Sequence, residues 1–131
     1  MPGDAENAQC WTSGPEACAS HRHYTIKPNL GFESERLVVD LDLDTNDEMV
    51  RFAVRQETIS GSGGGYVPIM EVHGDAGGIH RHWYAKSTGE TVSDAEPLFS
   101  DSFPTAPAAY DAASEQVFDQ WESSRMRWES A

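Results

Sequence analysis

The stretch RLVVDLDLDTNDEMVRFAVRQETI, Arg36 to Ile59, decides the fold. Apolar residues alternate with mostly acidic ones in its first half, and this period of two is typical of a β-strand with one buried face. The segment TNDE then interrupts the alternation with residues that favour turns. A second alternating run follows, so the stretch predicts a β-hairpin.

The charges of this hairpin complement one another. Pairing the apolar faces of the two runs places Arg51 and Arg55 on the same side as three aspartates, Asp40, Asp42 and Asp44. Opposite charges on neighbouring strands stabilise a sheet by up to about 1 kcal/mol for each pair. We therefore interpret these charged residues as structural.

A second hairpin is predicted by VHGDAGGIHRHWY, Val72 to Tyr84, in which GDAGG supplies the turn. If the loop holds an even number of residues, one face carries the polar side chains Glu71, His73, His80, His82, Tyr84 and Lys86. The other face then carries Tyr66, Met70, Val72, Ile79, Trp83 and Ala85. Burial of one face resists slips in register, so this clean partition favours the even loop.

The C-terminal segment from Ala108 to Glu129 contains no Gly or Pro and predicts a helix. A stripe of residues recurs at steps of three and four, with Phe118 widening it: Tyr110, Ala113, Val117, Trp121 and Trp128. We expect Val117, Trp121 and Trp128 to face the sheet. The histidine face would then lie on the side of the sheet away from the helix.

These elements predict an α+β fold: an antiparallel sheet of four or five strands, built from two hairpins, with one C-terminal helix packed on one face. Residues 34–131 are predicted to form this single domain. Residues 1–33 are predicted to be an irregular N-terminal segment with a short strand near His21–Ile26, because Gly, Pro, Ala and Ser dominate there. We expect residues 1–15 to be mobile and dispensable.

The chain is strongly acidic, with 22 Asp and Glu against 9 Lys and Arg and a net charge of −13. Such a charge disfavours nucleic-acid binding, which depends on Lys and Arg displacing counterions. It keeps a small protein soluble, and it would also suit docking on a basic partner. No apolar run is long enough to span a membrane, and the N-terminus lacks the pattern of a secretory signal, so we expect a cytoplasmic protein.

The histidine face suggests two kinds of chemistry. His73, His80, His82 and Glu71 form a set that could bind zinc or another divalent metal. Without a metal, the histidines could act as general acid and base, with Tyr84, Lys86 or Arg81 stabilising an anion. Arg81 suits this role least, because its parity places it on the helix side. A purely structural role and a pH-sensitive interface are the further alternatives.

A second metal set is suggested near the N-terminus by CASHRH, in which Cys18 precedes His21 and His23. This spacing permits a zinc half-site, although the surrounding small residues do not enforce it. In a reducing compartment Cys10 and Cys18 are expected to be free thiols.

The motif HGDAGGIHRHWY, followed by a helix with spaced Trp residues, resembles small bacterial and phage domains that carry an H-G…H-x-H-[RW]-Y hairpin. The resemblance covers residues 67–86 and the helix. These domains have no settled activity to carry over, but some similar small proteins are toxin-like, which favours a ribonuclease. This chain departs from the pattern in having Trp83 before the tyrosine and an N-terminal extension.

The net charge favours a non-catalytic protein-interaction or regulatory module that binds another protein. The histidine cluster favours the alternative, a small hydrolase that resembles a ribonuclease or a metal-dependent phosphoesterase. In that alternative the catalytic residues would be His80, His82, His73, Glu71 and Tyr84. The sequence contains no motif that decides between the two, such as HExxH or a nucleophile elbow.

Overall fold

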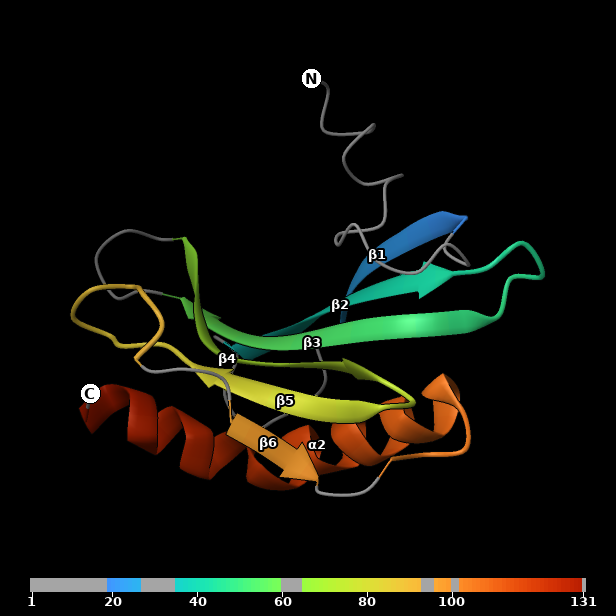
Figure 1. Ribbon diagram of the computed structural model, residues 1–131. Coiled ribbons are helices and arrows are strands. Elements are labelled where there is room, and N and C mark those ends of the chain that lie inside the picture. The colour runs from blue at the N-terminus through green and yellow to red at the C-terminus, as the bar shows by residue number, and fades with distance from the viewer. Residues whose placement is uncertain (1–18, 27–34, 60–64, 93–95, 100–101, 131) are drawn as a thin grey trace.

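The computed structural model describes residues 19–26, 35–59, 65–92, 96–99 and 102–130, and it consists of one antiparallel sheet with one long helix beneath it (Figure 1). Its elements follow in chain order: β1 (Ser20–Ile26), β2 (Glu35–Leu43), β3 (Met49–Ile59), β4 (Tyr66–Asp75), β5 (Gly78–Trp83), β6 (Glu96–Phe99) and α2 (Ala106–Ser130). Each strand pairs with the next one along the chain. The predicted α+β architecture is confirmed, but the described sheet has six strands rather than four or five.

β1 and β6 form the two edges of the sheet. The short strand predicted near His21–Ile26 is present as β1, which pairs with β2 along its whole length, so it lies in the sheet although the predicted domain begins only at residue 34. The hydroxyl of Tyr24 lies 3.4 Å from that of Tyr110 on the helix, and burial together with this contact raises the pKa of Tyr24 to about 12. Residues 1–15 and the two cysteines lie outside the described residues.

The hairpin of β2 and β3 forms as its alternation predicts. Asp44 holds the connecting turn, because its carboxylate accepts hydrogen bonds from the backbone N–H groups of Asn46 and Glu48 at 2.8 and 3.0 Å. Arg51 donates to the Oδ2 atom of the buried Asp42, which stands directly opposite it in the register. The predicted charge pairing across the hairpin is therefore confirmed for this pair.

The hairpin of β4 and β5 has the even loop. Asp75 pairs with Gly78, which leaves a two-residue turn, and His73 pairs with His80. The glycine at position 74 is required here, since a Cβ atom on it would lie 2.2 Å from the backbone oxygen of Gly78.

One residue predicted for the apolar face lies elsewhere. The register between β3 and β4 shifts between Gln56 and Glu57, and Ile69 is the extra residue on β4. A bulge of this kind reverses the inward and outward alternation beyond it. Tyr66 consequently contacts Arg36, whose guanidinium carbon lies 3.7 Å from the centre of the tyrosine ring, rather than joining the core beside Met70.

The short strand β6 is attached to β5 through an ion pair. Arg81 donates to Glu96 from its Nε atom at 2.8 Å, and the indole nitrogen of Trp83 donates to the same carboxylate oxygen at 3.1 Å. The hydrogen bonds from Arg81 and Trp83 lower the pKa of Glu96. Pro97 is tolerated in β6 because an edge strand leaves one side of its backbone without a sheet partner.

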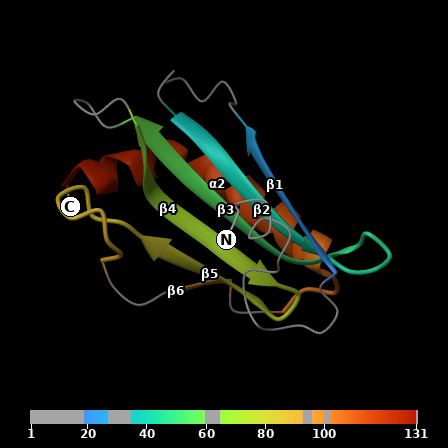
Figure 2. The ribbon, with the colours of Figure 1, turned by 90° about the horizontal axis from the view of Figure 1, so that it is seen from above.

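Helix α2 crosses one face of the sheet diagonally (Figure 2). Thr105 caps its start by accepting a hydrogen bond from the N–H of Ala108. The side of α2 against the sheet carries mostly small residues: Ala106, Ala109, Ala113, Val117, Ser124 and Trp128. Val117 and Trp128 join the core as predicted, whereas Trp121 is half-buried. Phe118 does not widen the buried stripe, because it lies on the outer side of the helix and is 40% exposed.

Candidate functional site

All five histidines project from the face of the sheet opposite the helix, which we call the open face. The backbone register pairs His21 with Asp42 and His23 with Asp40 at one edge. It pairs His73 with His80, and Glu71 with His82, further across. Gln56, which donates to the backbone carbonyl of Trp121, marks the opposite face that packs on the helix. The prediction that the histidines of the second hairpin share one face away from the helix is confirmed.

His73, His80 and His82 form the central histidine cluster. The rings of His73 and His82 are stacked, with centroids 4.8 Å apart and planes inclined by 11°. Their Nε2 atoms lie 2.8 Å apart, so one ring donates a hydrogen bond to the other. The ring of His80 lies 5.9 Å from that of His73 and is more exposed. The three histidines therefore lie close together on one face, and their predicted catalytic or metal-binding role stays a prediction.

Burial lowers the pKa of His73, and the neighbouring imidazoles of His82 and His80 lower it further. Arg51 acts in the same direction, whereas Asp75 opposes it. A neutral His73 can accept a proton, as a general base does. The same neutrality also suits a half-buried side chain with no catalytic task.

The other predicted site residues are less closely associated with the cluster. Glu71 accepts a hydrogen bond from Arg55 at 3.3 Å. Burial raises the pKa of Tyr84, and the charge of Glu71 raises it further. Arg81 lies on the helix side, where it donates to Gln120 on α2, in agreement with its parity. Lys86 lies away from the cluster, with its ammonium 5.2 Å from the ring centre of Trp128.

A second cluster on the open face joins His21 and His23 of β1 to Asp40 and Asp42 of β2, and we call it the edge histidine cluster. His21 places one ring nitrogen 2.9 Å from Asp40 and the other 2.8 Å from Asp42. His23 shares the same Asp40 oxygen at 2.7 Å. Sequence reasoning missed this arrangement, although a His-x-His strand beside an Asp-x-Asp strand is visible in the sequence. The zinc half-site predicted with Cys18 cannot be followed, because that cysteine lies outside the described residues.

No group of three or more His, Cys, Asp and Glu side chains within the described ranges has the geometry to hold a metal ion. His73, His80, His82 and Glu71 are all within those ranges. Binding of zinc or another divalent metal by these four residues stays a prediction.

The arginines of the open face are paired with carboxylates. Arg51 pairs with Asp42, and Arg55 pairs with both Glu57 and Glu71. The charge of Arg51 reaches His73 and lowers its pKa, but Arg51 and Arg55 are both held by carboxylates. A site that acts on phosphates needs cations that are available to the substrate.

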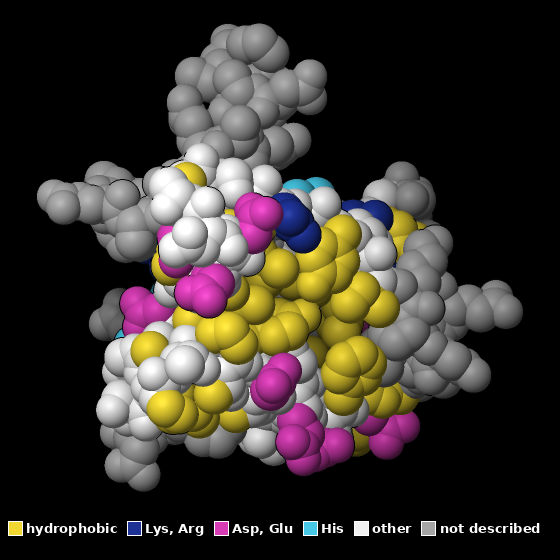
Figure 3. All heavy atoms as spheres, turned by 90° about the vertical axis from the view of Figure 1, so that its right-hand side faces the viewer, with side chains coloured by type: hydrophobic (Ala, Val, Ile, Leu, Met, Phe, Trp, Pro, Cys, Tyr) yellow, Lys and Arg dark blue, Asp and Glu magenta, His cyan; other side chains and the backbone are white. Residues whose placement is uncertain are grey.

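A hollow lies apart from the open face, where the β2–β3 turn meets the start of α2. It has a volume of about 490 Å³ and is lined by Met49, Val50, Ala106 and Pro107 together with acidic residues of the turn. Figure 3 shows hydrophobic side chains gathered over this end of the molecule, with Asp and Glu side chains around them. None of the predicted site residues lines this hollow.

Comparison with protein-family models, with curated proteins and with solved structures finds no match to this chain.

Proposed function

We propose that the protein is a non-catalytic protein-interaction module that binds its partner through the open face of the sheet. The observation that carries this proposal is the gathering of all five histidines on the face that the helix leaves uncovered. His80 and His23 are exposed there, and His73 and His82 are half-buried. Exposed aromatic and polar side chains on a rigid sheet are well suited to a binding surface.

The charge of the chain indicates the kind of partner. With a net charge of −13, the protein favours a basic partner. The arginines Arg51 and Arg55 of the open face are paired with carboxylates, so their charges are already balanced there.

A small hydrolase without a metal is the second candidate, and one observation favours it. The contact between His73 and His82 couples a half-buried imidazole of lowered pKa to a second imidazole, which is a donor and acceptor pair suited to acid–base catalysis. The paired arginines and the net charge weigh against an anionic substrate such as RNA.

We also propose a cytoplasmic location and a partner outside the membrane. Among the described residues, no helix combines the length and the apolar character that a membrane span needs.

The test is quantitative affinity purification at neutral pH with three proteins: the parent, the double variant His80→Ala/His82→Ala, and the helix variant Phe118→Ala. Phe118 is an exposed aromatic on the far side of the molecule and serves as the control. The expected result is a partner retained by the parent and by Phe118→Ala but lost by the double variant.

Equal retention by all three proteins would contradict the use of the open face. The same samples should be incubated with single-stranded RNA. Cleavage by the parent with a bell-shaped pH profile, abolished in His82→Ala, would replace the interaction module with the hydrolase.

A further inference from the structure

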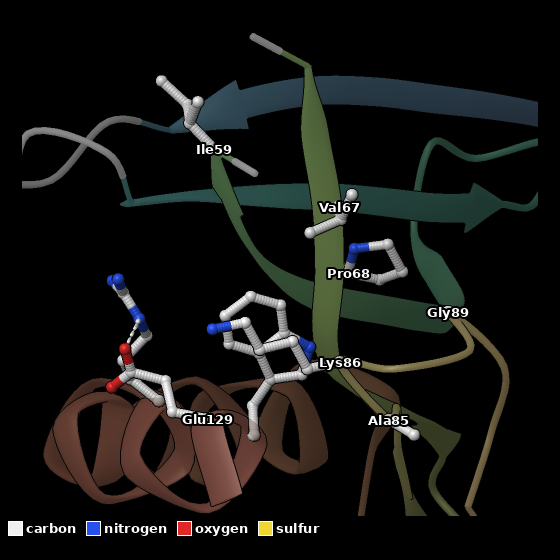
Figure 4. Close-up of a pocket in the computed structure, with 9 residues that line it drawn as sticks. Ile59, Val67, Pro68, Ala85, Lys86, Gly89 and Glu129 are labelled. Atoms are coloured by element: carbon white, nitrogen blue, oxygen red, sulfur yellow. Dashed lines mark ion pairs between the residues drawn. The ribbon is translucent and has the colours of Figure 1, made fainter. Parts of the chain in front are cut away.

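A cavity of about 310 Å³ lies between one end of the sheet and the C-terminal half of α2. Figure 4 shows Ile59, Val67 and Pro68 on the sheet side, with Lys86 and Glu129 on the side of the helix. The volume is at the small end of the range for ligand pockets. The open face takes no part in this cavity, because its lining contains none of the five histidines.

One wall of the cavity is apolar, whereas the charged groups of Lys86, Arg125 and Glu129 line the rest of it. Ile59, Val67 and Pro68 contribute aliphatic surface, and the buried indole of Trp128 lies across from them. The ammonium of Lys86 lies 5.2 Å from the centre of the Trp128 ring. A cation held beside an apolar pocket is the arrangement that recognises an apolar molecule ending in an anion.

The ionised groups around the cavity leave one positive charge available. Arg125 pairs with the buried Glu35 and lies 3.8 Å from Glu129. Lys86 forms no ion pair with any carboxylate in the part of the chain that the structure describes. Arg125 is therefore largely neutralised by its two carboxylates, whereas Lys86 can accept an anionic ligand.

We infer that this cavity binds a small organic carboxylate with an apolar body. The carboxylate would pair with the ammonium of Lys86, and the body would lie against Val67, Pro68 and the Trp128 ring. This inference is independent of the proposed function, since it uses no residue of the open face.

The experiment titrates the full chain with octanoate and with 1-naphthoate. Binding is measured by calorimetry and by the NMR resonance of the indole N–H of Trp128. The neutral analogue octanamide is titrated in parallel. The matched variants are Lys86→Gln and Arg22→Gln, which each remove one positive charge. Arg22 is exposed on the edge strand β1, remote from the cavity.

We expect at least one carboxylate to bind saturably and to shift the Trp128 resonance. Octanamide should bind the parent about tenfold more weakly than octanoate does, and Lys86→Gln should bind the carboxylate about tenfold more weakly than the parent does. The variants Arg22→Gln and His80→Ala/His82→Ala should bind the carboxylate like the parent. Lys86→Arg should restore most of the affinity, because the charge is kept. Preference for octanoate or for naphthoate distinguishes an aliphatic from an aromatic ligand.

Three results would overturn the inference: no saturable binding up to about 10 mM, equal weakening by Lys86→Gln and Arg22→Gln, or equal affinity for octanoate and octanamide. The variant Val67→Phe fills the cavity without touching a charge and should also lose binding. Circular dichroism and thermal melting establish that each variant is folded before it is titrated.

Discussion

The Nε2 atoms of His73 and His82 lie 2.8 Å apart on the open face. Only one of these nitrogens can donate at a time, so protonation of both would place two N–H groups against each other. The arrangement therefore favours the state in which at least one of the two rings is neutral.

The first prediction is that stability falls in mild acid partly through His73. Its pKa is lowered from 6.5 in the folded protein, mainly by burial, so the unfolded chain takes up this proton at higher pH than the folded protein does. The contribution is full above about pH 6.5 and is lost as the pH falls through the folded pKa. Urea unfolding of the parent and of His73→Gln should show a shallower pH dependence in the variant, with exposed His80→Gln as control. Identical slopes for His73→Gln and the parent would contradict this.

The second prediction contrasts two phenylalanines. Phe52 is fully buried and meets the ring of Tyr110 edge-on at 5.5 Å, whereas Phe118 is 40% exposed on the outer side of the helix. Phe52→Ala should lower the free energy of unfolding by about 3–5 kcal/mol, and Phe118→Ala by less than about 1 kcal/mol. Chemical denaturation measures both. If the two variants lost comparable free energy of unfolding, the side of α2 that carries Phe118 would have to be buried, which would contradict this prediction.

The sequence predicted the elements whose pattern repeats. The alternation in β2 and β3, the turn glycines of the β4–β5 hairpin and the uninterrupted helix each predicted local structure that the protein contains. The face of each histidine in the second hairpin followed from the same parity. Those predictions succeed because period and turn chemistry are properties of a single segment.

The remaining features depend on contacts between segments. Parity along one strand puts Tyr66 on the wrong face, because the bulge at Ile69 shifts the alternation and a bulge depends on two strands at once. Phe118 belongs to no buried stripe, because α2 packs on the sheet through small residues such as Ala109 and Ala113. The pairing of His21 with two aspartates required knowledge that β1 lies beside β2.

The third prediction concerns two glycines. A Cβ atom at Gly74 would lie 2.2 Å from the backbone oxygen of Gly78, whereas a Cβ atom at Gly65 meets nothing within 4 Å. Gly74→Ala should force the β4–β5 hairpin apart and destabilise the protein by about 1–3 kcal/mol. Gly65→Ala should be neutral or slightly stabilising, because alanine restricts the unfolded chain. Thermal melting of the two variants tests this, and a native melting temperature for Gly74→Ala would contradict the close approach of the strands.

The last prediction concerns the buried ion pair between sheet and helix. Glu35 has a fully buried side chain on β2 and pairs with Arg125 of α2, and the same carboxylate accepts a hydrogen bond from Gln56. A buried charge that loses its partner keeps its desolvation cost, so Arg125→Met should destabilise the protein by about 3–5 kcal/mol. The control Arg127→Met removes an exposed arginine that lies over the ring of Trp83, and should cost less than about 1 kcal/mol.

The double variant Glu35→Leu/Arg125→Met distinguishes the cost of leaving the Glu35 carboxylate buried without a partner from the cost of losing the packing contacts of Arg125. If the cost of Arg125→Met comes from the orphaned carboxylate of Glu35, replacing that carboxylate with an apolar side chain should recover most of the stability. A double-mutant cycle measured by urea unfolding should then give a coupling energy of about 2 kcal/mol or more. Additive losses in the cycle would instead mean that each side chain stabilises the helix through its own packing, and that the charges of Glu35 and Arg125 contribute little to holding α2 on the sheet.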